Sequence, residues 1–212
     1  MFKRFSSKRP HFPTVSRTQP FRGEAPRRRG MLRLGAMAVG AGAVLTSFAA
    51  LAAPGMTISS SAFHDGGRLP RQYAGPGECG GKNSNLPVAW QNLPDGTKSV
   101  VVTLKDPDGA KGAGVTHWIV YNIPAAVNEI KAGRVEKTTG SMTVGKNSAG
   151  AEAYRGACPP PGDTPHHYIL SVTATDLAPG SLAAGLDTAS LPAALAGHTL
   201  NGSTIVATYG RR

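Results

Sequence analysis

The residues best suited to chemistry gather in one stretch of the chain, residues 154–168. Three consecutive prolines, Pro159–Pro161, fix the backbone and remove hydrogen-bond donors, so they cannot lie inside a sheet. The next run, His166–Asp176, is rich in β-branched and aromatic residues and predicts a strand. Because side chains alternate along a strand, His166 and Tyr168 share one face, and the histidine between them takes the other. Ionisable groups at the mouth of an apolar strand indicate a small pocket.

Two further strand edges carry polar groups. The apolar run Ser99–Leu104 leads into Asp106, Pro107 and Asp108, and the proline stops the strand there. On this motif alone, an aspartate-rich turn explains both carboxylates, since aspartate favours turns. His117 opens the next apolar run, and a histidine in this position, taken alone, is more often a satisfied core or surface residue than a ligand-binding group.

The elements that must position these groups are short. Six runs of β-type residues are separated by Pro and Gly, a pattern that predicts an antiparallel sandwich or barrel. These runs are Met56–Phe63, Lys98–Lys105, Thr116–Ile123, Gly140–Val144, His166–Thr175 and Ser203–Tyr209. One helix is predicted, Thr188–Ala196, with Thr188 or Ser190 as its N-cap and Gly197 as its stop.

Residues 1–53 have the three zones of an export signal. They hold 10 of the 23 Lys and Arg residues and one of the 12 acidic residues, so they carry +9 of the formal net charge of +11. An uncharged run, Leu34–Leu51, follows the basic part, and the small residues Ala50 and Ala52 form a cleavage site before Pro54. We expect processing after Ala52 or Ala53 and a periplasmic or secreted location.

The route of export stays open. The segment from Arg28 to Arg33 resembles a twin-arginine signal, which the weakly hydrophobic run also fits. The alternatives are a general secretory signal, or a true start at Met31 instead of Met1. The Gly- and Ala-rich run is a poor spanning helix, so the processed protein is not expected to be integral to a membrane.

Residues 54–212 are long enough for one domain with a full core. They carry a net charge of only +2, which argues against a nucleic-acid partner despite a sequence pI near 10.1. Two cysteines, Cys79 and Cys158, fall in this part. An oxidising compartment would permit them to pair, but sequence separation does not say whether they approach.

Four ordered blocks together resemble the phosphatidylethanolamine-binding protein family, in its bacterial Raf-kinase-inhibitor-like branch. The resemblance covers nearly all of residues 56–212. The blocks are Asp106-Pro107-Asp108, the strand His117-Trp118 to Asn122-Ile123-Pro124, the loop and strand Tyr154–Pro160 and His166–Tyr168, and the end Gly197-His198 to Tyr209-Gly210-Arg211. Cys79-Gly80-Gly81-Lys82-Asn83, with Pro87 and Trp90, resembles an earlier family segment.

The resemblance implies a mainly β fold, an antiparallel two-sheet β-sandwich with one or two short helices. It also implies a small pocket that accepts phosphate-type anions such as a phospholipid head group, without catalysis. The pocket residues that it implies are Asp106, His117, Cys158, Pro159, Pro160, His166 and Tyr168. It places Cys79 and Cys158 in segments near that pocket, so a Cys79–Cys158 disulfide is expected.

Departures from the family pattern concern the pocket rim. Gly109 and Ala110 follow the Asp-Pro-Asp block where the family usually has proline. Ala157 also replaces a proline, and Gly80 replaces an aspartate. The central groups match the family pattern, whereas the loops around them match less well.

The chemistry of these residues agrees with an anion site. Two imidazoles and a phenol supply donors, and a histidine with an ordinary pKa of about 6.5 can gain charge when an anion arrives. Asp106 is expected to accept a hydrogen bond from a histidine ring and favour its protonated form. No cofactor is expected, and no metal, because no short-spaced pair of ligands marks such a site.

Two other classes of function remain. A hydrolase would need an activated nucleophile, but no Gly-x-Ser-x-Gly elbow is present and a disulfide would silence Cys158. The main alternative is an inhibitor or interaction protein acting on a protease or another periplasmic partner, as some family members do.

Overall fold

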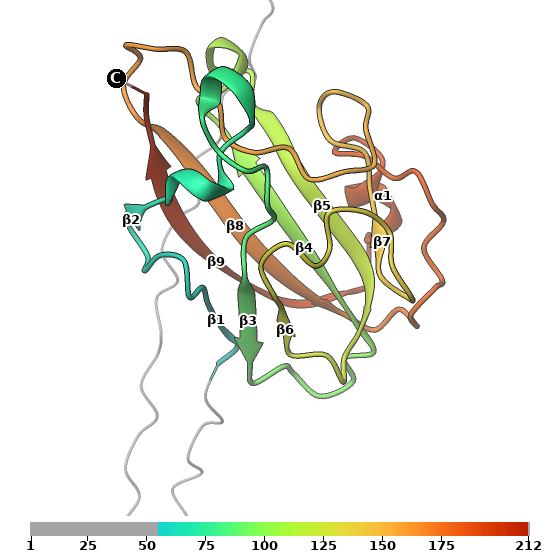
Figure 1. Cartoon of the computed structure of the whole chain (residues 1–212). Coiled ribbons are helices and arrows are strands. Elements are labelled where there is room, and N and C mark those ends of the chain that lie inside the picture. The colour runs from blue at the N-terminus through green and yellow to red at the C-terminus, as the bar shows by residue number, and fades with distance from the viewer. Residues whose placement is uncertain (1–54, 212) are drawn as a thin grey trace, which may run out of the picture. The chain divides into compact units, whose positions relative to one another are not determined.

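The computed structural model describes residues 55–211, and these form two β-sheets. The larger sheet has the strand order β2-β9-β8-β4-β5-β7, and the smaller has the order β1-β3-β6. The long strands β4, β5, β8 and β9 run side by side, with the small sheet packed across one face of them (Figure 1). The bounds are β1 Thr57–Ser59, β2 Gly67–Arg68, β3 Val88–Gln91, β4 Ser99–Asp106, β5 Val115–Pro124, β6 Glu129–Ile130, β7 Thr143–Val144, β8 His166–Thr175 and β9 Thr199–Tyr209.

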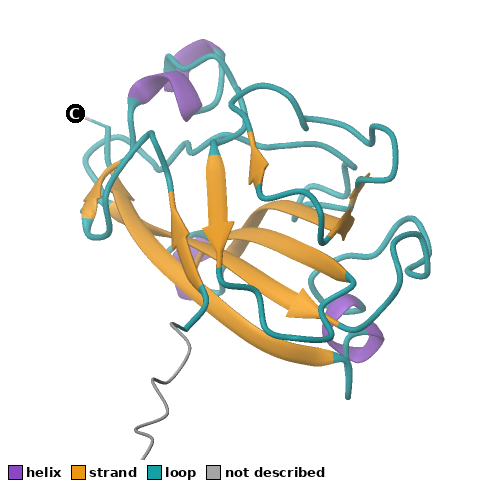
Figure 2. Cartoon of the chain, turned by 90° about the horizontal axis from the view of Figure 1, so that it is seen from below, coloured by secondary structure: helices purple, strands orange, loops and turns teal. Residues whose placement is uncertain are grey.

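The core lies between the two sheets, which Figure 2 shows from below. Alternate residues of β4 and β8, such as Val102 and Leu170, face the small sheet and its buried Trp90. A second apolar cluster covers part of the opposite face of the large sheet, where Leu191 of the short helix α1 (Leu191–Ala194) packs with Tyr121. Strand β5 is thus buried on both faces along almost its whole length, whereas the pocket ends of β4 and β8 are exposed on their outer face at Lys105 and His167.

The predicted mainly β sandwich is confirmed, with differences in the short elements. Every strand pair is antiparallel except β2 with β9, which is parallel. The run Met56–Phe63 forms only a three-residue strand, and Gly140–Val144 forms only a two-residue strand. The strands β2, β3 and β6 have two to four residues, too few to show an alternating pattern.

The predicted helix Thr188–Ala196 is too long by several residues. Helix α1 spans four residues, and Ser190 at its N-cap position makes no side-chain capping bond to it. Asp187 does the capping instead, because its Oδ1 atom accepts the N–H groups of Ala189 and Ser190. Three 3-10 helices, Arg71–Tyr73, Gly77–Cys79 and Ala110–Gly112, were not predicted.

The described residues contain no helix with the length and apolar character needed to span a bilayer. The predicted export signal lies outside the described residues, and it stays a prediction.

Candidate functional site

The candidate site lies where β4 ends and β5 and β8 begin, at the upper end of the sheet in Figure 1. Strand β4 pairs with both neighbours, so its last residue, Asp106, meets residues from each of them. The loop before β8 completes the wall of a cavity of about 480 Å³. The lining residues are Asp106, Gly109, Ala110, Gly114, Val115, His117, Ser148, Arg155, Gly156, Cys158, Pro159, Pro160 and His166.

The Asp106 carboxylate is buried and almost fully bonded. Its Oδ1 atom accepts the backbone N–H groups of Asp108 at 3.0 Å and Gly109 at 2.8 Å. Its Oδ2 atom lies 2.8 Å from Nδ1 of His166. Burial alone would raise the pKa of Asp106, but the imidazoles of His117 and His166 and the Gly109 N–H lower that pKa to about 2. Asp106 is therefore a fixed negative charge that orients its neighbours.

His117 presents a nitrogen without a partner to the cavity. Its Nδ1–H donates to the backbone carbonyl of Arg155 at 2.7 Å, because a carbonyl oxygen can only accept. Its Nε2 atom is 3.8 Å from Oδ2 of Asp106 and makes no hydrogen bond to any described residue. The residue is only 4% exposed and lines the cavity, so this nitrogen is a buried polar group for which a ligand in the cavity could supply the missing partner.

His166 lies between two carboxylates. Its Nδ1–H donates to Asp106, and its Nε2 atom is 3.7 Å from Oδ2 of Asp163, a half-exposed residue before the strand. Burial alone would lower the pKa of His166, but the hydrogen bond and charge of Asp106, with smaller contributions from Asp108 and Asp163, raise it. The arrangement favours an imidazolium beside the cavity.

Tyr168 has a different place from the one that the resemblance implies. It is fully buried and is not among the residues that line the cavity. Its ring packs edge-on against the His117 ring, with 5.2 Å between the centroids. Burial first, and then the Asp106 charge, raise the pKa of Tyr168 well above its ordinary value. Tyr168 therefore supports His117 from behind and stays protonated.

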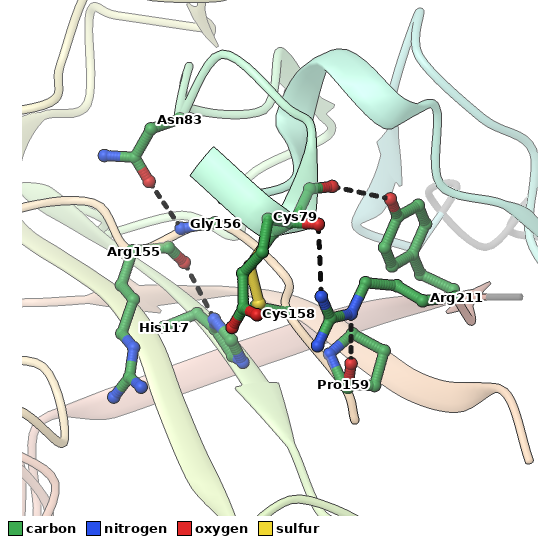
Figure 3. The surroundings of a disulfide bond; sticks show 10 residues. Cys79, Asn83, His117, Arg155, Gly156, Cys158, Pro159 and Arg211 are labelled. Carbon is green, nitrogen blue, oxygen red and sulfur yellow. Dashed lines mark hydrogen bonds between the residues drawn. A yellow bond between two sulfur atoms is a disulfide. The ribbon is translucent and has the colours of Figure 1, made fainter. Parts of the chain in front are cut away.

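The wall opposite β5 is tied together by several bonds (Figure 3). A disulfide joins Cys79 to Cys158, with their Cα atoms 5.3 Å apart. The Arg211 guanidinium donates to the carbonyls of Glu78 and Pro159, one in each disulfide-linked segment. The backbone N–H of Gly156 donates to Oδ1 of Asn83 at 2.7 Å.

Gly156 is also required by close packing. A Cβ atom at this position would lie 2.4 Å from backbone atoms of Ala74 and Gly75, which is far too near. The backbone of the cavity wall therefore rests directly on the neighbouring segment.

The structure brings together six of the seven predicted pocket residues, with Tyr168 behind the others. Several lining residues were missed. Arg155 lies inside the loop that the resemblance singles out, so only its role was unrecognised. Ser148, in contrast, lies in an irregular segment with no sequence signal that connects it with the pocket.

One cluster of metal-ligand type occurs among residues 55–211, namely Glu78, Cys79 and Cys158. Both sulfur atoms are bonded to one another, so neither is available as a thiolate ligand.

Comparisons with known proteins agree with this fold. The family model described as phosphatidylethanolamine-binding protein matches residues 59–210. YbcL of Escherichia coli, described as a UPF0098 protein, is 41% identical over 123 residues, which are 55% of this chain and 67% of YbcL. A UPF0098 protein of Aquifex aeolicus is 31% identical over 174 residues, which are 80% of this chain and 98% of the relative.

Solved structures give the same result. The crystal structure of E. coli YbcL, titled a new member of the mammalian PEBP family, superposes with a TM-score of 0.67 at 31% identity. The match covers 74% of this chain and 99% of that chain. A homologue from Chlamydia trachomatis, titled a putative phosphatidylethanolamine-binding protein, gives a TM-score of 0.64 at 28% identity, covering 74% of this chain and 98% of the other. The chain therefore belongs to the phosphatidylethanolamine-binding protein family.

Proposed function

We propose that the protein binds a small phosphate-type anion, either free or as a phospholipid head group, in the cavity beside Asp106, His117 and His166, without chemical turnover. The observation that carries the proposal is the buried Nε2 atom of His117, which has no hydrogen-bond partner among the described residues although His117 lines the cavity. An unsatisfied buried polar atom costs about 1–3 kcal/mol, and an anion that accepts its hydrogen bond removes that cost.

The charges around the cavity suit this role. With Nδ1–H held by the Arg155 carbonyl, His117 can offer Nε2 to an anion only after gaining a second proton. Asp106, 3.8 Å away, stabilises the resulting imidazolium. Pro159 and Pro160 add a rigid apolar wall that needs little ordering when a ligand binds.

Turnover is not part of the proposal, because the cavity offers no activated nucleophile. Cys158 is in the disulfide. Ser148 lines the cavity, which the sequence did not predict, but its oxygen accepts the Thr116 N–H and has no hydrogen bond to either histidine.

The location is also a proposal. We infer export to the periplasm or the medium from the basic, apolar and small-residue zones of residues 1–53.

Calorimetric titration with inorganic phosphate and with phosphoethanolamine tests the binding proposal. We expect His117→Ala to weaken binding about ten- to hundredfold, the equivalent of about 1.5–3 kcal/mol for a charge-assisted hydrogen bond. We also expect Asp106→Asn to weaken binding, although it removes a negative charge, because the imidazolium loses its counter-charge. Tighter binding by Asp106→Asn would mean that the carboxylate only repels the ligand.

His198→Ala is the matched control, because His198 is an exposed histidine that pairs with Asp176 and does not line the cavity. Binding to wild type should weaken as pH rises through the raised folded pKa of His166, because the positive charge of that imidazolium beside the cavity is lost. Equal affinity in wild type, His117→Ala and His198→Ala would refute the site.

A further inference from the structure

We propose that the cavity contains a second anion subsite at its mouth, formed by Arg155 and Ser148, so that the preferred ligand is a phosphate ester with a second acidic group such as a carboxylate. This inference rests on the proposed phosphate site, to which it adds the chemistry of the rest of the ligand.

Two consecutive residues of β5 hold the subsite in place. The backbone N–H of Arg155 donates to the His117 carbonyl at 2.9 Å, and the Arg155 carbonyl accepts the His117 ring proton. One residue earlier, Thr116 donates its N–H to the Ser148 hydroxyl at 2.7 Å and accepts the Ser148 N–H at 3.0 Å. Arg155 and Ser148 thus flank the strand that carries His117, and both line the cavity.

Both side chains retain donors for a ligand. The Arg155 side chain is exposed, and no carboxylate of a described residue forms an ion pair with it. Figure 3 shows it extending away from the disulfide. The Ser148 oxygen accepts the Thr116 N–H, and its hydroxyl proton donates to no other described residue, so this proton can bond to a ligand.

The donors run from a buried position to an exposed one. The Nε2 atom of His117 is at the buried end, whereas Ser148 and Arg155 are exposed at the mouth. A guanidinium binds a carboxylate through two parallel hydrogen bonds, which a hydroxyl or an ammonium group cannot accept in the same way.

The negative charge of Asp163 limits how a ligand with two acidic groups can lie in the cavity. Asp163 lies beside His166, with its side chain 51% exposed, and it would repel a second negative group placed there. A ligand whose phosphate occupies the histidine site therefore gains most by directing its second acidic group towards Arg155.

Three phosphomonoesters of equal length test this subsite: phosphoglycolate, 2-hydroxyethyl phosphate and phosphoethanolamine, which end in a carboxylate, a hydroxyl and an ammonium group. We expect phosphoglycolate to bind about tenfold more tightly than 2-hydroxyethyl phosphate, as a charge-assisted pair would give. Arg155→Met should abolish that preference, so that phosphoglycolate and 2-hydroxyethyl phosphate bind this variant with affinities within about twofold of each other. Arg155→Lys should keep part of the preference.

Arg134→Met is the matched control, because Arg134 is exposed and does not line the cavity. It makes the same change of net charge and should retain the full preference. The Arg155 contacts that hold His117 come from the backbone, so the substitution preserves them, and a thermal melt of Arg155→Met should match wild type.

Three results would overturn the inference, and they can be told apart. If the three esters bind equally, the subsite is absent and the phosphate site stands. If neither the esters nor inorganic phosphate bind, the proposed function fails as well. A preference that Arg134→Met also loses would show a general effect of net charge in place of a subsite.

Discussion

The ring of His166 donates its Nδ1 proton to Oδ2 of Asp106 across 2.8 Å, and both residues are buried. The same carboxylate holds two backbone N–H groups of the following turn. This hydrogen bond therefore links the end of β4 to the start of β8. It also favours the ionised form of Asp106 and the protonated form of His166.

This pair predicts a pH dependence of stability. The pKa of His166 is raised above its ordinary 6.5, so its contribution is fully present below pH 6.5 and is lost as pH rises through the folded pKa. The pKa of Asp106 is lowered from 3.8 to about 2, so its contribution is present above pH 3.8 and is lost as pH falls towards 2. Urea denaturation from pH 2 to pH 9 should therefore show that the contribution of this pair to the free energy of unfolding is greatest between about pH 3.8 and pH 6.5.

We expect Asp106→Asn to lower the free energy of unfolding by about 2 kcal/mol near pH 6 and to flatten both limbs of that profile. Asp108→Asn is the control, since Asp108 makes an exposed pair with His167 and should cost less than about 1 kcal/mol. An unchanged pH profile in Asp106→Asn would contradict the assignment.

Tyr168→Phe tests the supporting role of that ring. The Tyr168 hydroxyl is buried and makes no hydrogen bond within residues 55–211, so its removal should leave stability unchanged or raise it by up to about 1 kcal/mol. Phosphate affinity should stay within about threefold of wild type, because the packing against His117 is kept. A large loss of affinity in Tyr168→Phe would restore the tyrosine to the direct contacts that the family resemblance implies.

We expect removal of the Cys79–Cys158 disulfide to affect the stability of the fold more than it affects ligand binding. It closes a loop with a sequence separation of 79, so the double change to serine should lower the free energy of unfolding by about 4 kcal/mol in the chain-entropy model. The bonds from Arg211 and Asn83 remain, so the folded variant should still bind phosphate. Two free thiols in denatured, unreduced protein would show that the bond is not formed.

Asn122 has a left-handed φ of 59° inside β5 and is buried. Its amide donates to Thr143 and to the Leu182 carbonyl, and its oxygen accepts the Leu182 N–H. Asn122→Ala should cost about 3 kcal/mol in thermal denaturation, because it loses these bonds and strains the backbone. Asn122→Gly loses the bonds but tolerates the conformation, so it should be more stable than alanine by about 1 kcal/mol.

For the leader, we expect N-terminal sequencing of fractionated cells to find a mature chain that starts near Ala53. Changing Arg28 and Arg29 to Lys should block export only if the twin-arginine route is used. Recovery of a cytoplasmic protein that still begins with residues 1–30 would argue against export.

The long strands β4, β5 and β8 could be predicted because each carries eight or more residues with a clear β pattern. Only Ser203–Tyr209 of β9 was predicted, because Asn201 and Gly202 interrupt the β pattern before it. The exposed His167 between the buried His166 and Tyr168 shows that this alternation also gives the face of each side chain. The strands with two to four residues could not be predicted, since their pairing depends on tertiary contacts alone.

The sequence predicted most of the residues of the site, but it did not predict which of them contact one another. A hydrogen bond from a histidine to Asp106 was expected, but only the register of β4 with β8 selects His166 over His117. Asp163 lies three residues before His166, inside the stretch that the sequence singles out, so only its role escaped prediction. Ser148 lies in an irregular segment, and nothing in the sequence specifies that this segment returns to the start of β5.

The parallel pair of β2 with β9 joins Gly67 to Ala207, and so connects two distant segments of the domain. Closing so long a loop is entropically costly, and folding slows as contacts become less local. The cavity wall has the same character, since residues 74–83 must meet residues 154–158 before Cys79 and Cys158 are adjacent. We therefore expect the pocket to form late in refolding, so that the recovery of ligand binding reports the completed domain and not an early hairpin.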